Sequence, residues 1–225
     1  MDITLNYVET GEGFPLVLLH GNGEDHTYFK RQMEPFSLKY RVIALDTRGH
    51  GKSPRGSAPF TLDQFAEDLR EFLDQRGIAK CHLLGFSDGG NIALLFALKC
   101  PQYVEKLVLN GANLRPSGVK LSTQIPIVAG WCACGVCGLF SRQAKGNWEM
   151  LNLMGTQPHI KPQELKKLTT PTLVIAGEND MIREKHTRLI ATSLPNSKLV
   201  ILPGDHFVAR RNWEAFNPVV LEFLE

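Results

Sequence analysis

The sequence has no excess of charge of either sign. Its 25 Lys and Arg residues are balanced by 23 Asp and Glu residues, which leaves a formal net charge of +2, and the two signs are interspersed along the chain. A concentrated basic region is the usual signature of a protein that binds nucleic acid, because phosphates attract Lys and Arg. Without such a region, we expect no nucleic acid partner.

The sequence also has little that would direct it to a membrane or to an oxidising compartment. Residues 1–6 lack the basic start and the apolar run of a signal peptide. The longest uncharged stretch, 121–141, is interrupted by Ser, Thr, Gln, Pro and Gly, which argues against a membrane-spanning helix. The five cysteines are an odd number and favour free thiols over a disulfide framework. We expect a cytoplasmic protein with no membrane association.

The spacing of metal ligands is lacking as well. Cys132, Cys134 and Cys137 lie close together, but no second pair of Cys or His residues accompanies them, and zinc sites usually use four ligands. On a helix, Cys132 and Cys134 would point in nearly opposite directions. We interpret these cysteines as small apolar filler in a packed segment, and we expect neither a metal nor a cofactor.

What the sequence does have is a Gly-x-Ser-x-Gly motif, in residues 85–90 (Gly-Phe-Ser-Asp-Gly-Gly). The motif follows an apolar run at 81–84 that is typical of a buried strand, and it precedes 91–98, which is typical of a buried helix. In this position the motif indicates a nucleophile elbow, a sharp and strained turn that lifts the Ser87 hydroxyl above the sheet edge. The helix that begins there directs free N–H groups and the positive end of its dipole toward the serine.

A serine hydroxyl reacts only with help from a base, an acid that orients the base, and donors for the oxyanion. The strand-like runs 172–177 and 198–202 are followed by Glu-Asn-Asp at 178–180 and by Asp-His at 205–206. Another strand-like run, 15–19, leads into His-Gly-Asn-Gly at 20–23. Because parallel strands end at the same edge of a sheet, we expect these segments to converge on the serine.

These segments and the loop 46–53 (Asp-Thr-Arg-Gly-His-Gly-Lys-Ser) resemble the α/β-hydrolase-fold serine hydrolases, in the same order along nearly the whole chain. The resemblance implies Ser87 as nucleophile, His206 as base and Asp180 as the orienting acid. Glu178 is the alternative acid, and the family pattern favours Asp180 because it stands three residues after the glycine. Asp205 adjoins the histidine and is expected to form a turn.

The resemblance also implies the oxyanion donors, which would be the backbone N–H groups of Asn22 and Asp88. Asp88 departs from many relatives, in which the residue after the nucleophile is uncharged. A carboxylate in the first helical turn is stabilised by about 0.3–1 kcal/mol, which alone would explain it. The alternative is a counter-charge for a cationic substrate, since Ser-Asp-Gly-Gly is similar to the nucleophile region of biphenyl-hydrolase-like α-amino-acid ester hydrolases. In those enzymes the matching Asp binds the substrate ammonium.

The alternation of strands and helices predicts an α/β protein with the α/β-hydrolase fold, a mostly parallel sheet covered by helices on both faces, in one domain over 1–225. Further strands are expected at 3–8, 41–45 and 104–109. The clearest helix is 61–76, where Thr61 and Gln64 form a capping-box pattern. A last helical region begins either near Asn212 or at Val219, next to Pro218.

The alternation stops between residues 113 and 170, where the resemblance implies a small, mostly helical cap over the site. Residues 125–131 are apolar, and 141–155 read as an amphipathic helix with Trp148, Leu151 and Met154 on one face. Trp131 and Trp148 are therefore candidate substrate contacts. The equal alternative is that these side chains only pack the cap against the core.

Together these features predict a serine hydrolase that cleaves a small carboxylic ester through an acyl-enzyme, with an amide or a thioester as further options. We expect a small-molecule substrate as its partner, and a monomer or homodimer. Two alternatives stay open at this point. One is a C–C bond hydrolase or lyase of the same fold, and the other is a slow-turnover ligand-binding or sensor protein built on a hydrolase fold.

Overall fold

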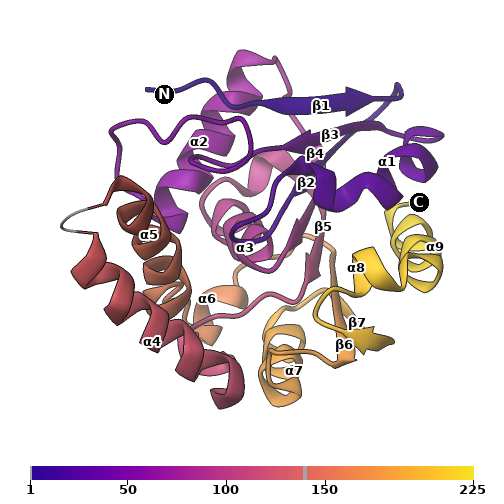
Figure 1. Ribbon diagram of the computed structural model, residues 1–225. Helices are drawn as coiled ribbons and strands as arrows, with labels where there is room; N and C mark the ends of the chain where they lie inside the picture. Colours follow the sequence, from indigo (N-terminus) through magenta and orange to yellow (C-terminus); the bar gives the residue numbers. More distant parts are fainter. Residues whose placement is uncertain (1, 139–140) are drawn as a thin grey trace.

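A mostly parallel, seven-stranded sheet forms the centre of the computed structural model, which describes residues 2–138 and 141–225 (Figure 1). The strand order is β1-β3-β2-β4-β5-β6-β7. β1 is antiparallel to β3, and the other five pairs are parallel. The strands are β1 (Tyr7–Thr10), β2 (Pro15–Leu19), β3 (Arg41–Leu45), β4 (Cys81–Phe86), β5 (Val104–Asn110), β6 (Thr172–Asn179) and β7 (Ser197–Asp205). The expected fold class is confirmed.

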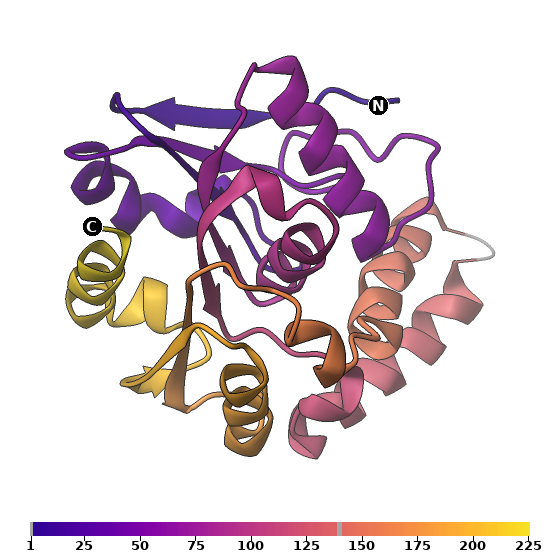
Figure 2. The same cartoon turned by 180° about the vertical axis from the view of Figure 1, so that it is seen from behind.

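Helices cover both faces of the sheet (Figures 1 and 2). One layer packs in a large apolar cluster with α2 (Leu62–Gln75), α3 (Asp88–Lys99) and α7 (Glu184–Ser193). The other layer packs in a second cluster with α1 (Lys30–Ser37), α8 (Val208–Arg211) and α9 (Trp213–Leu224). All six residues of β4 are buried because both of its faces are covered, which explains the continuous apolar run in its sequence.

The start of the first strand differs from the sequence prediction, and the start of the last helix decides between two alternatives. The first strand begins at Tyr7 rather than at Ile3, because at Asn6 the Ser53 hydroxyl interrupts the hydrogen-bond ladder with β3. There, the Asp46 N–H donates to the Asn6 carbonyl at 2.9 Å and the Asn6 N–H donates to Ser53 Oγ at 2.8 Å. The C-terminal helix α9 begins at Trp213 and contains Pro218, so the earlier of the two predicted starts is the correct one.

Two helices fill most of the interval between β5 and β6, α4 (Leu121–Cys137) and α5 (Arg142–Thr156). They lie side by side at one end of the molecule (Figures 1 and 2). Leu153 of α5 joins the apolar cluster of α2 and α3, and Glu149 forms an ion pair with Arg55 of the core. These helices occupy the region where the sequence predicts a cap, whose function stays a prediction.

Shorter helical turns complete the chain: η1 (His26–Phe29), η2 (Pro101–Tyr103), η3 (Pro116–Gly118) and α6 (Pro162–Leu165). None of the helices in the described ranges combines the length and the apolar character that crossing a bilayer requires.

Candidate active site

The turn between β4 and α3 has the strained geometry of a nucleophile elbow. Ser87 has φ 53° and ψ −120°, and it is the one non-glycine residue with a positive φ in the part of the chain that the structure describes. A Cβ atom at Gly85 would lie 2.2 Å from the Gly89 carbonyl oxygen, and one at Gly89 would lie 2.1 Å from the Leu19 carbonyl oxygen. Both glycines are therefore required for the close approach of strand and helix.

The structure brings together the three side chains that the sequence nominates as catalytic. His206 Nε2 lies 3.0 Å from Ser87 Oγ, and His206 Nδ1 lies 2.7 Å from Asp180 Oδ1. Because a carboxylate can only accept, the ring proton sits on Nδ1 and donates to Asp180. Nε2 is then free to accept the proton of the Ser87 hydroxyl. Asp180 and His206 are each 3% exposed, so water hardly competes for these bonds.

Asp180, rather than Glu178, contacts the histidine. Glu178 is exposed at the end of β6, whereas Asp180 Oδ1 also accepts from the Ile182 N–H at 2.8 Å, which fixes the carboxylate. Asp205 is turned to its own backbone and accepts from the Phe207 N–H at 2.9 Å, as expected of a turn residue.

One residue of the site was missed by sequence reasoning. Gly111, at the end of β5, has φ +64°, and a Cβ atom there would lie 2.7 Å from His206 Cε1. The imidazole thus lies directly against this backbone. The available signal was a glycine immediately after a buried strand.

The loop that carries Asn22 is held in place by a buried neutral histidine. His20 Nε2 accepts from the Thr47 N–H at 3.0 Å, which places the ring proton on Nδ1, 2.7 Å from the Gly21 carbonyl. Burial and, to a lesser extent, the neighbouring His50 lower the pKa of His20 to about 4. The loop can present the Asn22 N–H toward the serine. The Asp88 N–H belongs to the first turn of α3, where helical N–H groups have no intrahelical acceptor.

Asp88 is engaged on both of its carboxylate oxygens. Oδ2 accepts from Asn22 Nδ2 and Oδ1 accepts from Asn91 Nδ2, each at 3.0 Å. Burial raises the pKa of Asp88, and the two amides offset part of that rise. The side chain faces a space of only about 10 Å³, beside Leu153 of α5. That space has no room for an ammonium-bearing substituent, so the geometry gives no support to Asp88 as a counter-charge for the substrate.

The two tryptophans of the helix pair contact each other instead of the serine. Their rings are nearly parallel, at 20°, with centroids 6.4 Å apart. Among the described residues, neither Trp131 nor Trp148 lines the cavity next to Ser87. The expectation that they contact substrate therefore gains no support, and packing between α4 and α5 accounts for both.

A cavity of about 220 Å³ lies directly over the serine. Its walls are mostly apolar, with one acid among them, and comprise Gly21, Asn22, Glu24, Phe86, Ser87, Met154, Met181, His206 and Phe207. It adjoins a second cavity of about 330 Å³, with which it shares Met181, His206 and Phe207. Met154 comes from the amphipathic face of α5 that the sequence indicates. Small apolar cavities with a few polar groups are typical of small-molecule sites.

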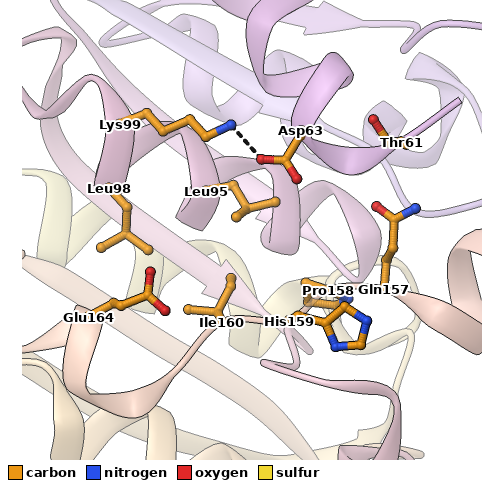
Figure 3. Close-up of a pocket in the computed structure, with 10 residues that line it drawn as sticks. All are labelled: Thr61, Asp63, Leu95, Leu98, Lys99, Gln157, Pro158, His159, Ile160 and Glu164. Atoms are coloured by element: carbon orange, nitrogen blue, oxygen red, sulfur yellow. Dashed lines mark hydrogen bonds and ion pairs between the residues drawn. The ribbon is translucent and has the colours of Figure 1, made fainter. Parts of the chain in front are cut away.

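A larger cavity of about 480 Å³ lies between α2, α3 and the segment 157–160 (Figure 3). It contains none of the three residues Ser87, Asp180 and His206. Its Lys99 and Asp63 form an ion pair with each other. This cavity is therefore separate from the candidate active site.

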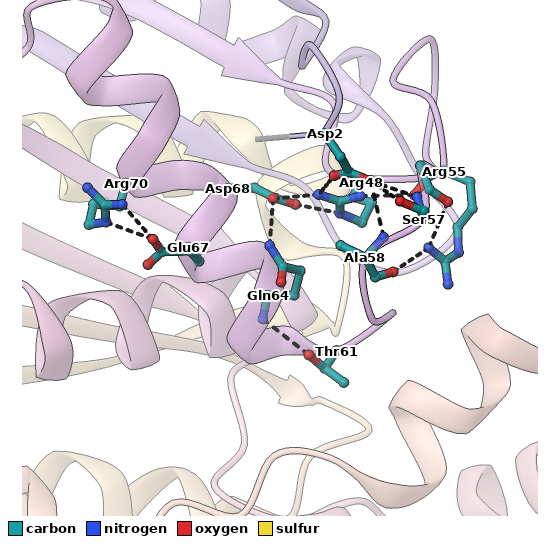
Figure 4. Close-up of polar contacts among 11 residues, drawn as sticks. Asp2, Arg48, Arg55, Ser57, Ala58, Thr61, Gln64, Glu67, Asp68 and Arg70 are labelled. Carbon is teal, nitrogen blue, oxygen red and sulfur yellow. Dashed lines mark hydrogen bonds and ion pairs between the residues drawn. The ribbon is translucent and has the colours of Figure 1, made fainter.

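The loop after β3 is ordered by a buried ion-pair network (Figure 4). The fully buried Arg48 donates to both oxygens of Asp68 at 2.7 Å and to Asp2 Oδ1 at 2.6 Å. Asp46 accepts from the backbone N–H groups of His26 and Lys52. Because the Thr47 N–H also donates to His20, this network supports the loop at residues 20–23 that carries Asn22.

Comparison with known proteins shows the family to which this chain is related. A family model described as "alpha/beta hydrolase fold" matches residues 15–131. The chain is similar to the human protein named serine hydrolase BPHL, at 30% identity over 99% of this chain and 84% of that protein. It is similar to a 2-hydroxy-6-oxononadienedioate/2-hydroxy-6-oxononatrienedioate hydrolase of Burkholderia vietnamiensis, at 31% identity over 99% and 91%. The crystal structure of a hydrolase from Pseudomonas aeruginosa PA01 superimposes with a TM-score of 0.82, at 27% identity over 99% and 94% of the two chains.

Proposed function

Since the chain belongs to the alpha/beta hydrolase fold family and is a hydrolase, we propose that it cleaves a small carboxylic ester through an acyl-enzyme formed on Ser87. One observation carries this proposal. The Ser87 hydroxyl, the His206 imidazole and the Asp180 carboxylate form a continuous line of contacts, 3.0 Å and 2.7 Å long, at the wall of a small cavity. That arrangement activates an alcohol for attack on a carbonyl carbon.

In the first half of the reaction, Ser87 Oγ attacks the ester carbonyl and passes its proton to His206 Nε2. Asp180 holds the ring in the required tautomer and stabilises the imidazolium that forms. The N–H groups of Asn22 and Asp88 donate to the oxyanion, where preorganised donors stabilise the developing charge. When the carbonyl reforms, the C–O bond to the alcohol breaks, and the imidazolium protonates the departing oxygen.

In the second half, a water molecule replaces the alcohol. His206 takes a proton from the water, the resulting hydroxide attacks the acyl carbon, and the same N–H groups stabilise the second oxyanion. Collapse of this intermediate breaks the bond to Ser87 Oγ, which recovers its proton from the imidazolium. The products are a carboxylic acid and an alcohol, and the enzyme returns to its initial protonation state.

The proposal is tested with a fluorophosphonate probe and with short p-nitrophenyl esters. The wild-type protein should gain one probe adduct by mass spectrometry, and Ser87→Ala should gain none and lose at least about 10⁴-fold in kcat. Ser122→Ala is the matched control, because Ser122 is exposed and lines the adjoining cavity without contacting the histidine. Labelling or turnover that survives in Ser87→Ala would refute the proposal.

A second candidate is hydrolysis of a carbon–carbon bond, which is supported by the relative from Burkholderia vietnamiensis. The substrate in that name is a dicarboxylate. In the present chain no Lys or Arg lines the described cavity at Ser87, and its one acid is Glu24. A dianion would therefore find no cation among the described residues beside Ser87, although Lys120 lines the adjoining cavity, and this absence beside the nucleophile favours an ester. A dienedioate substrate turned over faster than every simple ester would reverse this preference.

A further inference from the structure

The cavity at Ser87 contains one carboxyl group that the proposed mechanism does not use, that of Glu24. We propose that Glu24 determines substrate specificity by accepting a hydrogen bond from a hydroxyl or ammonium group of the substrate. This assignment rests on the proposed ester hydrolysis and adds a substrate class to it: small esters that carry a hydrogen-bond donor near the scissile bond.

The position of Glu24 places its carboxyl group beside the reacting atoms. It lines the same cavity as Ser87 and His206, and it follows the Asn22 loop by two residues. A Cβ atom at Gly21 would lie only 3.2 Å from Glu24 Oε2, so the carboxyl group folds back over the oxyanion loop. A substrate held by that loop would therefore lie next to Glu24.

The carboxyl group has an unused acceptor. Glu24 Oε2 is buried and has no hydrogen-bond partner among the residues that the structure describes. Desolvation raises the pKa of Glu24 and outweighs a backbone hydrogen bond from Gly21 and the charges of Arg210 and His206, so that the pKa is about 7. A buried acceptor without a donor is destabilising, and a functional role is one explanation for such a group. A donor on the substrate would supply the missing bond.

Glu24 supplies the one carboxylate acceptor among the described residues that line the cavity. The nearby walls contributed by Phe86, Met154, Met181 and Phe207 are apolar. The Asn22 side-chain amide already donates to Asp88 Oδ2 and to the Met150 carbonyl, at 3.0 and 2.9 Å. Asp88, the acid next to the nucleophile in sequence, is not among the residues that line this cavity, and both of its oxygens are engaged.

An alternative role for Glu24 Oε2 is to interact with Tyr28 instead of with a substrate. The Tyr28 hydroxyl is also buried without a partner in the described residues, and the Tyr28 ring stacks on Phe86 with centroids 4.2 Å apart. Burial raises the pKa of Tyr28, and Glu24 contributes to that rise, so the two groups are close enough to interact. If Glu24 only served Tyr28, then Tyr28→Phe and Glu24→Met would weaken turnover of all esters alike.

The test compares three ethyl esters of nearly equal shape: isobutyrate, lactate and alaninate, which differ by a methyl, a hydroxyl or an ammonium group on the α-carbon. A second set, propyl, 2-hydroxyethyl and 2-aminoethyl acetate, places the same groups in the alcohol part. Wild type should prefer a donor-bearing ester in at least one set. Glu24→Met should reduce that preference in kcat/KM by about 10- to 100-fold, the range for one hydrogen bond to a charged group.

Two further variants sharpen the result. Glu24→Gln keeps an acceptor oxygen without the charge, so it should retain a preference for the hydroxyl ester and lose one for the ammonium ester. Glu34→Gln is the matched control, because it removes the same charge from an exposed position on α1 and should leave every ratio unchanged.

The outcomes separate this proposal from the reaction on which it rests. Turnover that depends on Ser87 but shows the same substrate ratios in wild type and Glu24→Met would overturn the role of Glu24 alone. If no ester is turned over, ligand-detected NMR on Ser87→Ala measures the binding of the same esters without chemistry. Donor-bearing esters that bind no better than their methyl analogues, or that bind equally well after Glu24→Met is added, would also overturn it.

Discussion

Replacing Glu24 by Gln should stabilise the folded protein in neutral and alkaline buffer, and the gain should vanish in acid. Desolvation raises the pKa of Glu24 from its ordinary value of 4.5 to about 7. Between these values the folded protein holds a proton that the unfolded chain has released. The free energy of unfolding of the wild type therefore falls as pH rises through this window, and the loss is complete above pH 7. Gln carries no such proton.

The size of the gain follows from the shift. If the carboxyl group were wholly shielded from solvent, this pKa shift would correspond to roughly 3 kcal/mol in the free energy of unfolding. The Glu24 side chain is only half-buried and lies near the charges of Arg210 and His206, so screening removes part of the penalty. We expect Glu24→Gln to raise the free energy of unfolding by about 1–2 kcal/mol above pH 8, and by about zero below pH 4.

Urea unfolding of both proteins at intervals from pH 4 to pH 9, followed by circular dichroism, measures this difference. His82 and His186, whose pKa values burial lowers, do not contribute to the pKa of Glu24, so their effect cancels when the two curves are subtracted. A difference that stays constant across the range would show that the stabilisation has another origin. A wild type that is the more stable protein above pH 7 would show that the Glu24 carboxylate already has a partner, which would refute the unused acceptor.

Two further sets of substitutions test Asp180 and Asp68, two other carboxylates of the fold. Asp180→Asn should keep the fold and lower kcat by about 10⁴-fold, as the corresponding change does in serine proteases, because the imidazole adopts the wrong tautomer. Steady-state kinetics should show almost no change in Glu178→Gln, and equal losses in both variants would contradict the choice of acid. Arg48→Ala should cost about 3–5 kcal/mol in denaturant unfolding, because it leaves Asp68 buried without its counter-ion. Adding Asp68→Leu should recover part of that loss, and no recovery would mean that lost packing, not charge, is responsible.

The parts of the fold that local chemistry dictates could be predicted from the sequence. Helix α2 begins at Leu62 because Thr61 Oγ1 accepts from the Gln64 N–H, and it ends before Gly77, which has φ +64°. The same holds for the elbow. Its two positions require glycine, because a Cβ atom at either one would lie less than 2.5 Å from a backbone atom. The carboxyl ends of β6 and β7 carry the acid and the histidine because parallel strands finish at one edge.

The parts that depend on how distant surfaces meet could not be predicted. The amphipathic pattern of α5 correctly places Met154 at the cavity, but the direction of Trp131 and Trp148 is set by how α4 lies on α5. No motif encodes that contact. Likewise, residues 3–6 have the alternation of a strand, but the Asn6 N–H donates to the Ser53 hydroxyl instead of to the neighbouring strand.

Asp88 and Glu24 are both acids near Ser87, and the sequence alone does not show which of them contacts a substrate. Asp88 stands at a helix N-terminus, where the dipole and two amides satisfy it, so it can remain buried without a ligand. One of those amides, that of Asn22, also bonds the Met150 carbonyl of α5 and fixes the loop between elbow and helix. Glu24, two residues further along that fixed loop, lines the cavity, and its Oε2 has no hydrogen-bond partner in the described part of the chain. The environment therefore gives the two carboxyl groups different roles. Asp88 is satisfied within the protein, and Glu24, which is distant in sequence from the nucleophile, is positioned to bind the substrate.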